Sequence, residues 1–354
     1  MTHHDNRRAL ARRSFLALTG GAVLSLAACS PQVRSVAGTK PVGVLPSGDP
    51  ASGTELKIAA RTAQLQLEPA GLTKELAFTV AEWPNLGAGP DIIQGFRAKS
   101  IDLALNAGIP PIQAHAIGVQ ARIVAVQTRR YPLYTFATAP GSAVRKAGDF
   151  RGRKIAFSQG QAQGVVVLRA LREAGLENSD VELVELPSTQ FLTALQSGQV
   201  DVAPLAEPVL TKYLDEYGKD GARGVKTEVV DLLTVLWAPD EVLDDPEKAK
   251  AVRSFVPLWA RGQVWAWENQ DEWIDTYYVK DQGVSKEDGR RIVDSLHKPQ
   301  FPVSWDEAVA WEQETADLLA EGGFVPEQKA SELFDRRFET LAAEAVAAEY
   351  REGS

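Results

Sequence analysis

The chain is poor in the side chains that build disulfides, metal sites and catalytic triads. Cys29 is its one cysteine, so no disulfide can form within the chain, and stability must come from burial. His3 and His4 lie near the N-terminus, which leaves His115 and His297 as the other histidines. Two isolated histidines offer neither a metal-ligand pair nor a recognisable Ser-His-Asp arrangement. We therefore expect no catalytic residue, no metal ion and no cofactor.

Basic residues are also in short supply. The chain has 38 Lys and Arg against 47 Asp and Glu, which gives a formal net charge of −9. Phosphate backbones require a basic face, so nucleic acid is excluded as a partner. An acidic total still permits an anionic ligand, because a local pocket can be positive or rich in N–H donors. After residue 28 no stretch is apolar enough to span a membrane, which needs about 20 consecutive residues.

Residues 1–28 have the pattern of an export signal. Arginines at positions 7–8 and 12–13 precede an uncharged run of 14 residues, from 15 to 28, that ends in small residues. The closing Leu-Ala-Ala-Cys29 resembles the lipobox of bacterial lipoproteins. That resemblance implies that Cys29 becomes the first mature residue and carries the lipid. The alternative is an ordinary secretory signal that ends at a buried cysteine.

The export route has two candidates. Arg12-Arg13 followed by Ser14-Phe15-Leu16 resembles the twin-arginine motif. The sequence departs from that motif at Ala11, where Ser or Thr is usual, and at Ala17, where Lys is common. The general secretory route is therefore the alternative.

Residues 29–54 are expected to form a lipid-anchored linker. The segment is rich in Pro, Gly and Ser and has few large apolar residues, as solvated linkers do. A flexible chain of this length spans on the order of 25–30 Å. We therefore expect an exported protein that is attached through its lipid to the outer face of the cytoplasmic membrane.

From residue 55 onward the pattern predicts an α/β protein with mixed, mostly parallel sheets. A first strand is expected at 55–60, and strands then alternate with helices. Segments 95–110 and 193–208 follow one plan: a helix end, a turn, a short strand opened by Asp102 or Asp201, and a proline-bearing loop. This repeat predicts two similar lobes, although two ordinary helix-to-strand turns could also look alike by chance.

A small polar loop at 158–164 follows the strand expected at 153–157. The helix expected after it, at 165–174, ends at Gly175. Ligands of open α/β sheets bind at the carboxyl ends of strands, often on a helix N-terminus. The loop therefore has the form of a site for an anion or polar group, with an ordinary glycine-bearing turn as the alternative. It matches neither nucleotide-binding glycine motif.

Two β-prone segments, 131–137 and 231–237, are expected to be hinge strands that join the lobes, with the ligand cleft between them. Lobe I then comprises 55–135 and 238–354, and lobe II comprises 136–237. The helical tail carries four tryptophans that we expect to pack on lobe I, with a ligand role as the alternative: Trp259, Trp265, Trp267 and Trp273.

The chain resembles the solute-binding proteins of ABC importers for nitrate, sulfonate and taurine, which have the type II periplasmic binding protein fold. The matching stretches are Trp83-Pro84 with Gly89-Pro90, Ser100–Asn106, Asp149–Ala156 and Gly198–Pro208. Each motif is weak alone, but their order and spacing are those of the family. The likeness runs from about residue 55 to 260.

The resemblance implies a monomeric binding protein that closes on a small anionic solute and delivers it to an ABC permease. An aliphatic sulfonate or a taurine-like molecule is the expected solute. Arg61 is the expected anchoring cation, with Arg129 and Arg130 competing, whereas Glu207 suits an anion only if it pairs with an arginine or binds an amino group. The ligand contacts carried over are Arg61, Thr62, Ala63, Gln64, Asn106, Ala107, Gly108, Ser158, Gln159, Gly160, Gln161, Ala162, Glu207 and Trp237.

Other functions stay open at this point. Nitrate or a thiamine-precursor pyrimidine could replace the sulfonate, and a surface module that binds a partner protein would also suit a lipid anchor. The same fold hosts a desulfinase with a nucleophilic cysteine and a pyrimidine synthase that uses histidine. Because the one cysteine lies in the lipobox, we expect a binding protein rather than an enzyme.

Overall fold

The computed structural model describes residues 43–86 and 89–353, so the predicted signal peptide, Cys29 and most of the linker lie outside the described residues. The described residues belong to one compact unit. The described end of the linker has no helix or strand, yet Pro50 is buried and the amide of Ala51 donates to Glu247 Oε2 at 2.5 Å. Among the described helices, none combines the length and apolar character needed to cross a membrane.

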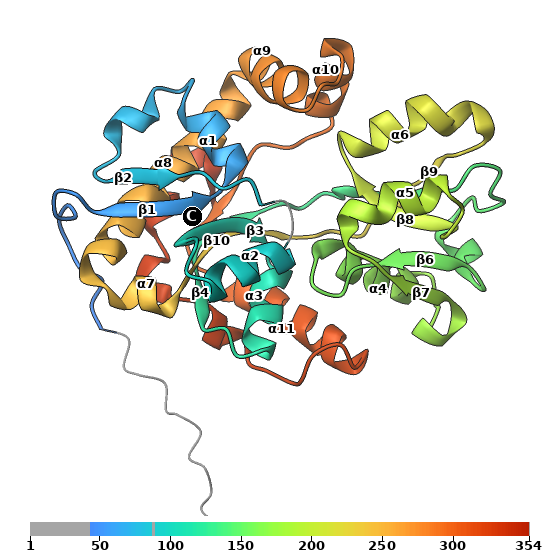
Figure 1. Ribbon diagram of the computed structural model, residues 1–354, viewed down its shortest axis with the longest axis horizontal. Coiled ribbons are helices and arrows are strands. Elements are labelled where there is room, and N and C mark those ends of the chain that lie inside the picture. The colour runs from blue at the N-terminus through green and yellow to red at the C-terminus, as the bar shows by residue number, and fades with distance from the viewer. Residues whose placement is uncertain (1–42, 87–88, 354) are drawn as a thin grey trace, which may run out of the picture. The chain divides into compact units, whose positions relative to one another are not determined.

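Two five-stranded sheets built on one plan organise the described residues (Figure 1). The first has the order β2 (Thr79–Glu82), β1 (Glu55–Ala59), β3 (Leu103–Ala107), β10 (Leu233–Pro239), β4 (Ala121–Thr128). The second has the order β7 (Glu182–Glu185), β6 (Lys154–Phe157), β8 (Val202–Ala206), β5 (Tyr134–Thr138), β9 (Gly224–Val225). In each sheet β10 or β5 runs antiparallel to its neighbours, and the other strands share one direction. The predicted mixed, mostly parallel α/β lobes are confirmed.

The repeated aspartates have the same role in both sheets. Asp102 Oδ2 accepts a hydrogen bond from the Lys57 amide in the middle of β1, and Asp201 Oδ2 accepts one from the Lys154 amide at the start of β6. Each aspartate amide in turn donates to the carbonyl of the same lysine. The pair of bonds fixes the register of β1 or β6 against its parallel neighbour, β3 or β8, which explains why the motif occurs twice.

The chain changes sheet in two short segments, 129–133 and 226–232, which carry no regular structure. The predicted lobe boundaries at 135 and 237 fall inside β5 and β10, whose whole lengths pair within one sheet. The crossings therefore precede these strands. The amide of Arg129 donates to the carbonyl of Leu232 at 2.7 Å, so the two crossing segments lie side by side.

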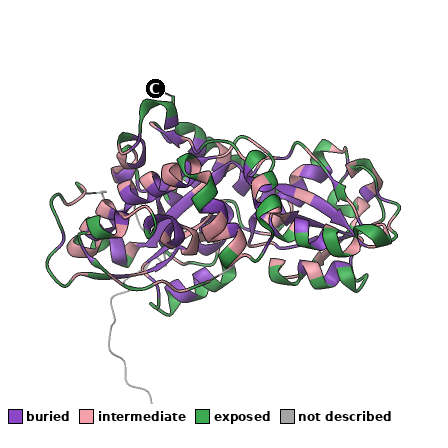
Figure 2. Ribbon diagram, turned by 90° about the horizontal axis from the view of Figure 1, so that it is seen from above, coloured by how far each residue is buried: buried purple, intermediate pink, exposed green. Residues whose placement is uncertain are grey.

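Helices cover both sheets, and the buried residues gather along the strands and inner helix faces (Figure 2). Trp237 of β10 is fully buried and packs edge-on against Phe96, with ring centroids 4.6 Å apart. The helices that follow strands of the first sheet are α1 (Arg61–Leu67), α2 (Gly89–Arg97), α3 (Ile109–Ala116) and α7 (Asp240–Asp244). Those that follow strands of the second sheet are α4 (Ala162–Glu173), α5 (Phe191–Gln196) and α6 (Val209–Tyr217).

The C-terminal part of the chain is helical, as predicted. Its helices are α8 (Pro246–Glu268), α9 (Gln270–Trp273), a π-helix (Ile274–Asp281), α10 (Lys286–Asp294), α11 (Asp306–Glu321) and α12 (Leu341–Glu344). A short parallel pair, β11 (Phe301–Pro302) and β12 (Arg351–Glu352), closes this region. Figure 1 shows α9 and α10 on one side of the structure and α11 on the other.

Three local expectations about loops need correction. Arg61–Gln64 form the first turn of α1 rather than a loop, because a single residue separates β1 from the helix. Residues 106–107 belong to β3. Helix α4 begins at Ala162, not at 165, and its Gly164 packs so closely on the Ser158 carbonyl that a Cβ would collide with it.

Candidate functional site

Two adjoining cavities open near the crossings between the sheets. The smaller, of about 300 Å³, is lined by residues at the carboxyl ends of β3, β4 and β8 and by aromatic residues of the C-terminal helices. The larger, of about 680 Å³, lies between α6, α10 and the second crossing. They share four lining residues, namely Tyr131, Leu133, Glu207 and Leu296.

Of the residues predicted to contact ligand, Thr62 and Glu207 line the smaller cavity. Thr62 lies in the first turn of α1, and Glu207 directly follows β8. The other predicted contacts line neither cavity.

Arg61, the expected anchoring cation, is already engaged. Its Nη2 lies 2.8 Å from Asp281 Oδ1, and its Nη1 donates to Gln64 Oε1 at 2.9 Å. Gln64 in turn donates to Glu68 at 2.7 Å. Arg61 therefore links α1 to the π-helix, and Gln64 bonds to side chains one helical turn away on either side.

Asn106 and Trp237, both predicted ligand contacts, bind each other. The indole Nε1 of Trp237 donates to Asn106 Oδ1 at 2.8 Å, and the Trp237 side chain is fully buried. The neighbouring Ala107 pairs with Thr234 of β10. The pair thus stabilises the first sheet.

The predicted 158–161 loop contacts the first-sheet side through its backbone. The Gln159 carbonyl accepts from Gln113 of α3 at 3.0 Å, and the Gln159 amide donates to Glu185 at 3.1 Å. Ser158 and Gln161 are buried and bonded to each other at 2.8 Å. The backbone N–H of Gln159, one of the donors expected to bind an anion, is therefore already bonded to the carboxylate of Glu185.

Arg129 is the basic side chain that lines the smaller cavity. Among the described residues that line the smaller cavity, it is the only Arg or Lys. Its ion pair with Asp231 spans 3.4 Å, and its buried Nε makes no hydrogen bond to the described residues. Burial raises the pKa of Asp231, and the charges of Arg129 and Arg169 oppose that rise. Arg130, the other competitor, pairs with Glu307 and Glu352 instead.

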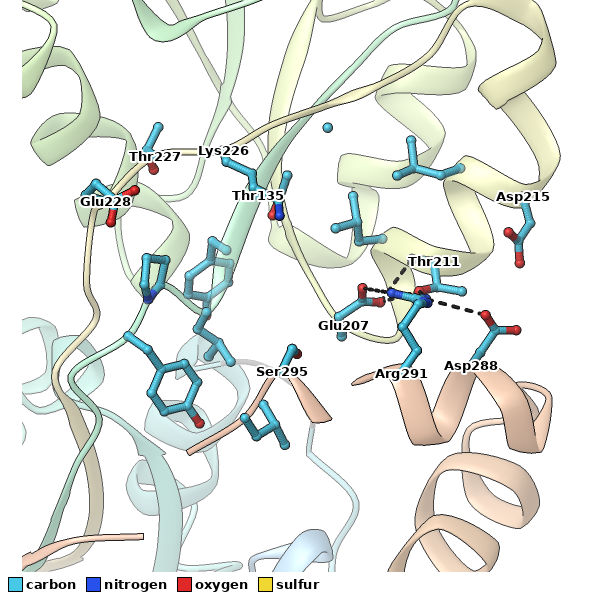
Figure 3. Close-up of a pocket in the computed structure, with 18 residues that line it drawn as sticks. Thr135, Glu207, Thr211, Asp215, Lys226, Thr227, Glu228, Asp288, Arg291 and Ser295 are labelled. Carbon is cyan, nitrogen blue, oxygen red and sulfur yellow. Dashed lines mark hydrogen bonds and ion pairs between the residues drawn. The ribbon is translucent and has the colours of Figure 1, made fainter. Parts of the chain in front are cut away.

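The larger cavity has a different character (Figure 3). Arg291 of α10 reaches across to the start of α6: its Nη1 lies 3.5 Å from Oε1 of Glu207, which precedes the helix, and its Nη2 donates to Thr211. Glu207 also accepts from the Thr211 amide at 3.1 Å. Glu207 therefore pairs with an arginine, one of the two arrangements that would reconcile it with an anionic ligand nearby.

Glu312 of α11 is a buried carboxyl that the sequence did not reveal, and it lies near the start of α3. Glu312 of α11 is 1% exposed and lies against Gly108, where a Cβ would come within 2.5 Å of Glu312 Oε2. Its Oε1 has no hydrogen-bond partner among the described residues. Burial raises the pKa of Glu312 to about 8, and the charge of Asp231 adds to the rise while Arg169 opposes it.

This raised pKa predicts a pH-dependent stability. Between the ordinary pKa of 4.5 and about 8, the unfolded chain releases the proton while the folded chain keeps it. Stability therefore falls as pH rises through this window, by up to about 1.4 kcal/mol per pH unit. Glu312→Gln removes the titrating group. The Tm of the variant minus the Tm of the wild type should therefore increase from pH 5 to pH 8. Parallel Tm profiles would show that Glu312 ionises normally.

The two remaining histidines lie far apart in the sequence and have separate surroundings. His115 Nε2 lies 3.8 Å from Glu332, and the ring of His297 is tilted against that of Tyr131, with centroids 4.6 Å apart. Within the described ranges, no group of three or more His, Cys, Asp or Glu side chains could hold a metal ion.

Comparison with known proteins extends these observations. The model of the NMT1/THI5-like family matches residues 87–273. A relative in Escherichia coli (strain K12), named as an aliphatic sulfonates-binding protein, is 31% identical over 42% of this chain and 48% of its own length. A relative of the same name in Bacillus subtilis (strain 168) is 24% identical over 67% of this chain and 70% of its own length. This chain therefore spans about half the length of the first relative.

Solved structures share the fold. The alkanesulfonate-binding protein SsuA from Xanthomonas axonopodis pv. citri, bound to MOPS, superposes with a TM-score of 0.69 at 21% identity, over 85% of this chain and all of that one. The desulfurization enzyme DszB superposes with a TM-score of 0.54 at 15% identity, over 84% of this chain and 99% of its own. The fold thus carries both binding proteins and an enzyme, and the two sulfonate-binding relatives confirm the resemblance found in the sequence.

Proposed function

Because the chain belongs to the NMT1/THI5-like family, we propose that it is a solute-binding protein that delivers a small anion of the sulfonate class to an ABC permease. The observation that carries the proposal is Arg129, which lines a cavity between the two sheets and has a donor free of partners in the described residues. A guanidinium suits a sulfonate because it offers several N–H donors in a plane to several oxygens. The sulfonate-binding relatives support this class of solute.

Hinge closure would follow from the position of Arg129. It starts the first crossing segment and bonds to Leu232 and Asp231 of the second. A ligand that binds Arg129 and residues from both sheets favours the closed arrangement, in which the two sheets lie close together. The permease would recognise that closed state.

The closed arrangement would be held from two sides. Arg291 links α10 to α6 through Glu207, and Arg169 of α4 donates to Thr315 of α11 at 2.9 Å while its guanidinium lies 3.8 Å from the Trp311 ring. Opening would have to break both sets of contacts.

We also propose that the protein is exported, is lipidated at Cys29 and acts as a monomer on the outer face of the cytoplasmic membrane. The lipobox-like ending and the linker support this location. Cys29→Ser should move the protein from the membrane fraction to the soluble one. A variant that stays in the membrane fraction would argue against the lipid anchor.

A thermal-unfolding panel tests the proposed solute class. The purified protein is heated with sulfonates, taurine, nitrate, carboxylates and pyrimidines. At a hundredfold excess over Kd, a ligand that binds only the folded state adds about 2.7 kcal/mol, which raises Tm by several degrees. We expect shifts with sulfonates. Tm shifts confined to pyrimidines or nitrate would contradict the sulfonate class and identify the solute as one of these instead. No shift with any small solute would favour a module that binds a partner protein.

A further inference from the structure

We propose that the solute carries an aromatic ring, bound against Trp267, Trp273 and Tyr277, with its anionic group at Arg129. This inference rests on the proposed function, and the ligand class it names differs from the aliphatic sulfonates in the names of the relatives.

The smaller cavity is enriched in aromatic residues. Of the twenty described residues that line it, five are Trp or Tyr, a quarter of the lining, whereas aromatic residues make up 8% of the chain. The larger cavity has only two tyrosines among its eighteen described lining residues. The aromatic character therefore belongs to one cavity, the one that also contains Arg129.

The aromatic lining is packed into a fixed wall. Trp273 and Tyr277 stack with centroids 4.7 Å apart and an interplanar angle of 3°, and Tyr277 meets Tyr278 edge-on at 4.9 Å. Trp273 and Tyr278 are largely buried, while Trp267 and Tyr277 are half-buried and so keep accessible surface. A flat ring gains dispersion and quadrupole contacts on such a wall that a flexible alkyl chain does not match.

The wall and the cation belong to different parts of the fold. Trp267 lies in the last turn of α8 and Tyr277 lies on the π-helix, whereas Arg129 follows β4 at the first crossing. Polar side chains also line the cavity, among them Gln66 and Gln263, whose amides bond to each other at 3.0 Å. One ligand with a charged group and a ring would meet both features at once.

Isothermal titration calorimetry with matched anions tests the proposal. Benzenesulfonate should bind the purified protein at least tenfold more tightly than methanesulfonate and about threefold more tightly than cyclohexanesulfonate, which has the same number of carbons but no π system. Equal affinities, or tighter binding of hexanesulfonate than of benzenesulfonate, would overturn the proposal.

Variants locate the ring. Trp267→Leu should reduce the preference for benzenesulfonate over methanesulfonate at least threefold and leave methanesulfonate affinity nearly unchanged. Trp265→Leu is the matched control, since Trp265 is half-buried on the same helix but lines a different surface hollow. If Trp267→Leu does not fold, Tyr277→Leu serves the same purpose. An unchanged preference in the folded variant would place the ring elsewhere and overturn the assignment.

The outcomes separate this inference from the proposed function. Binding of methanesulfonate without benzenesulfonate overturns the ring and keeps the sulfonate-binding function. Binding of benzoate without any sulfonate keeps the ring and overturns the sulfonate class. Binding of none of these anions overturns both.

Discussion

Replacing Arg129 with methionine should lower the affinity for a bound sulfonate by about 30-fold or more, because removing one partner of a buried, hydrogen-bonded charge pair costs about 2–5 kcal/mol. Methionine keeps most of the length of the stem and removes the charge. Arg129→Lys should retain part of the affinity, since it keeps the charge but loses the planar arrangement of donors. The Kd of each variant is measured by calorimetry.

Two other arginines provide matched controls for this experiment. Arg61 pairs with Asp281, and Arg130 pairs with Glu307 and Glu352. Arg61→Met and Arg130→Met should each change the Kd less than threefold. A large loss from Arg61→Met together with a small one from Arg129→Met would restore the anchor expected from the sequence.

The stability of the Arg129→Met variant must be checked separately. Loss of the Arg129 guanidinium leaves Asp231, whose side chain is 5% exposed, without its ionic partner. Burial raises the pKa of Asp231, and removing Arg129 takes away one of the two positive charges that oppose this rise. The Tm without ligand therefore accompanies each Kd.

Trp237→Ala should lower the free energy of unfolding by about 3–5 kcal/mol, the usual cost of truncating a fully buried aromatic side chain. Trp237 is 0% exposed and packs on Phe96. Urea titration of the wild type and variant measures the difference.

Trp237→Phe separates the structural role from ligand binding. It keeps a ring but loses the indole hydrogen bond to Asn106, at a cost of about 1 kcal/mol. The folded variant should bind sulfonate with unchanged affinity. A loss of affinity beyond tenfold, at an almost unchanged stability, would show that Trp237 contacts the solute as the resemblance implied.

The lobes could be predicted because their signals are local. A lysine amide of β1 or β6 bonds to the aspartate that precedes the parallel neighbour, β3 or β8, and both aspartates occur in short, repeated segments. The boundaries were less accurate, since a β-prone segment does not reveal which sheet will pair with it. Strands β5 and β10 each pair in a sheet formed mainly by distant parts of the chain.

The site was predictable only in part. Thr62 and Glu207 follow strand ends, where sequence patterns point, and both line the smaller cavity. Trp273 is buried, as expected, but it and the half-buried Trp267 also line the smaller cavity, because helical spacing does not distinguish a core face from a cavity wall. Glu312 gave no local signal, since its burial depends on the packing of α11 against Gly108.

The most direct test is a crystal structure of the protein with the sulfonate that gives the largest thermal shift. We predict that the sulfonate oxygens lie within hydrogen-bond distance of the Arg129 guanidinium, inside the cavity that Thr62 and Glu207 also line. A sulfonate bound beside Arg61, at the 158–161 loop or outside the two cavities would contradict the account.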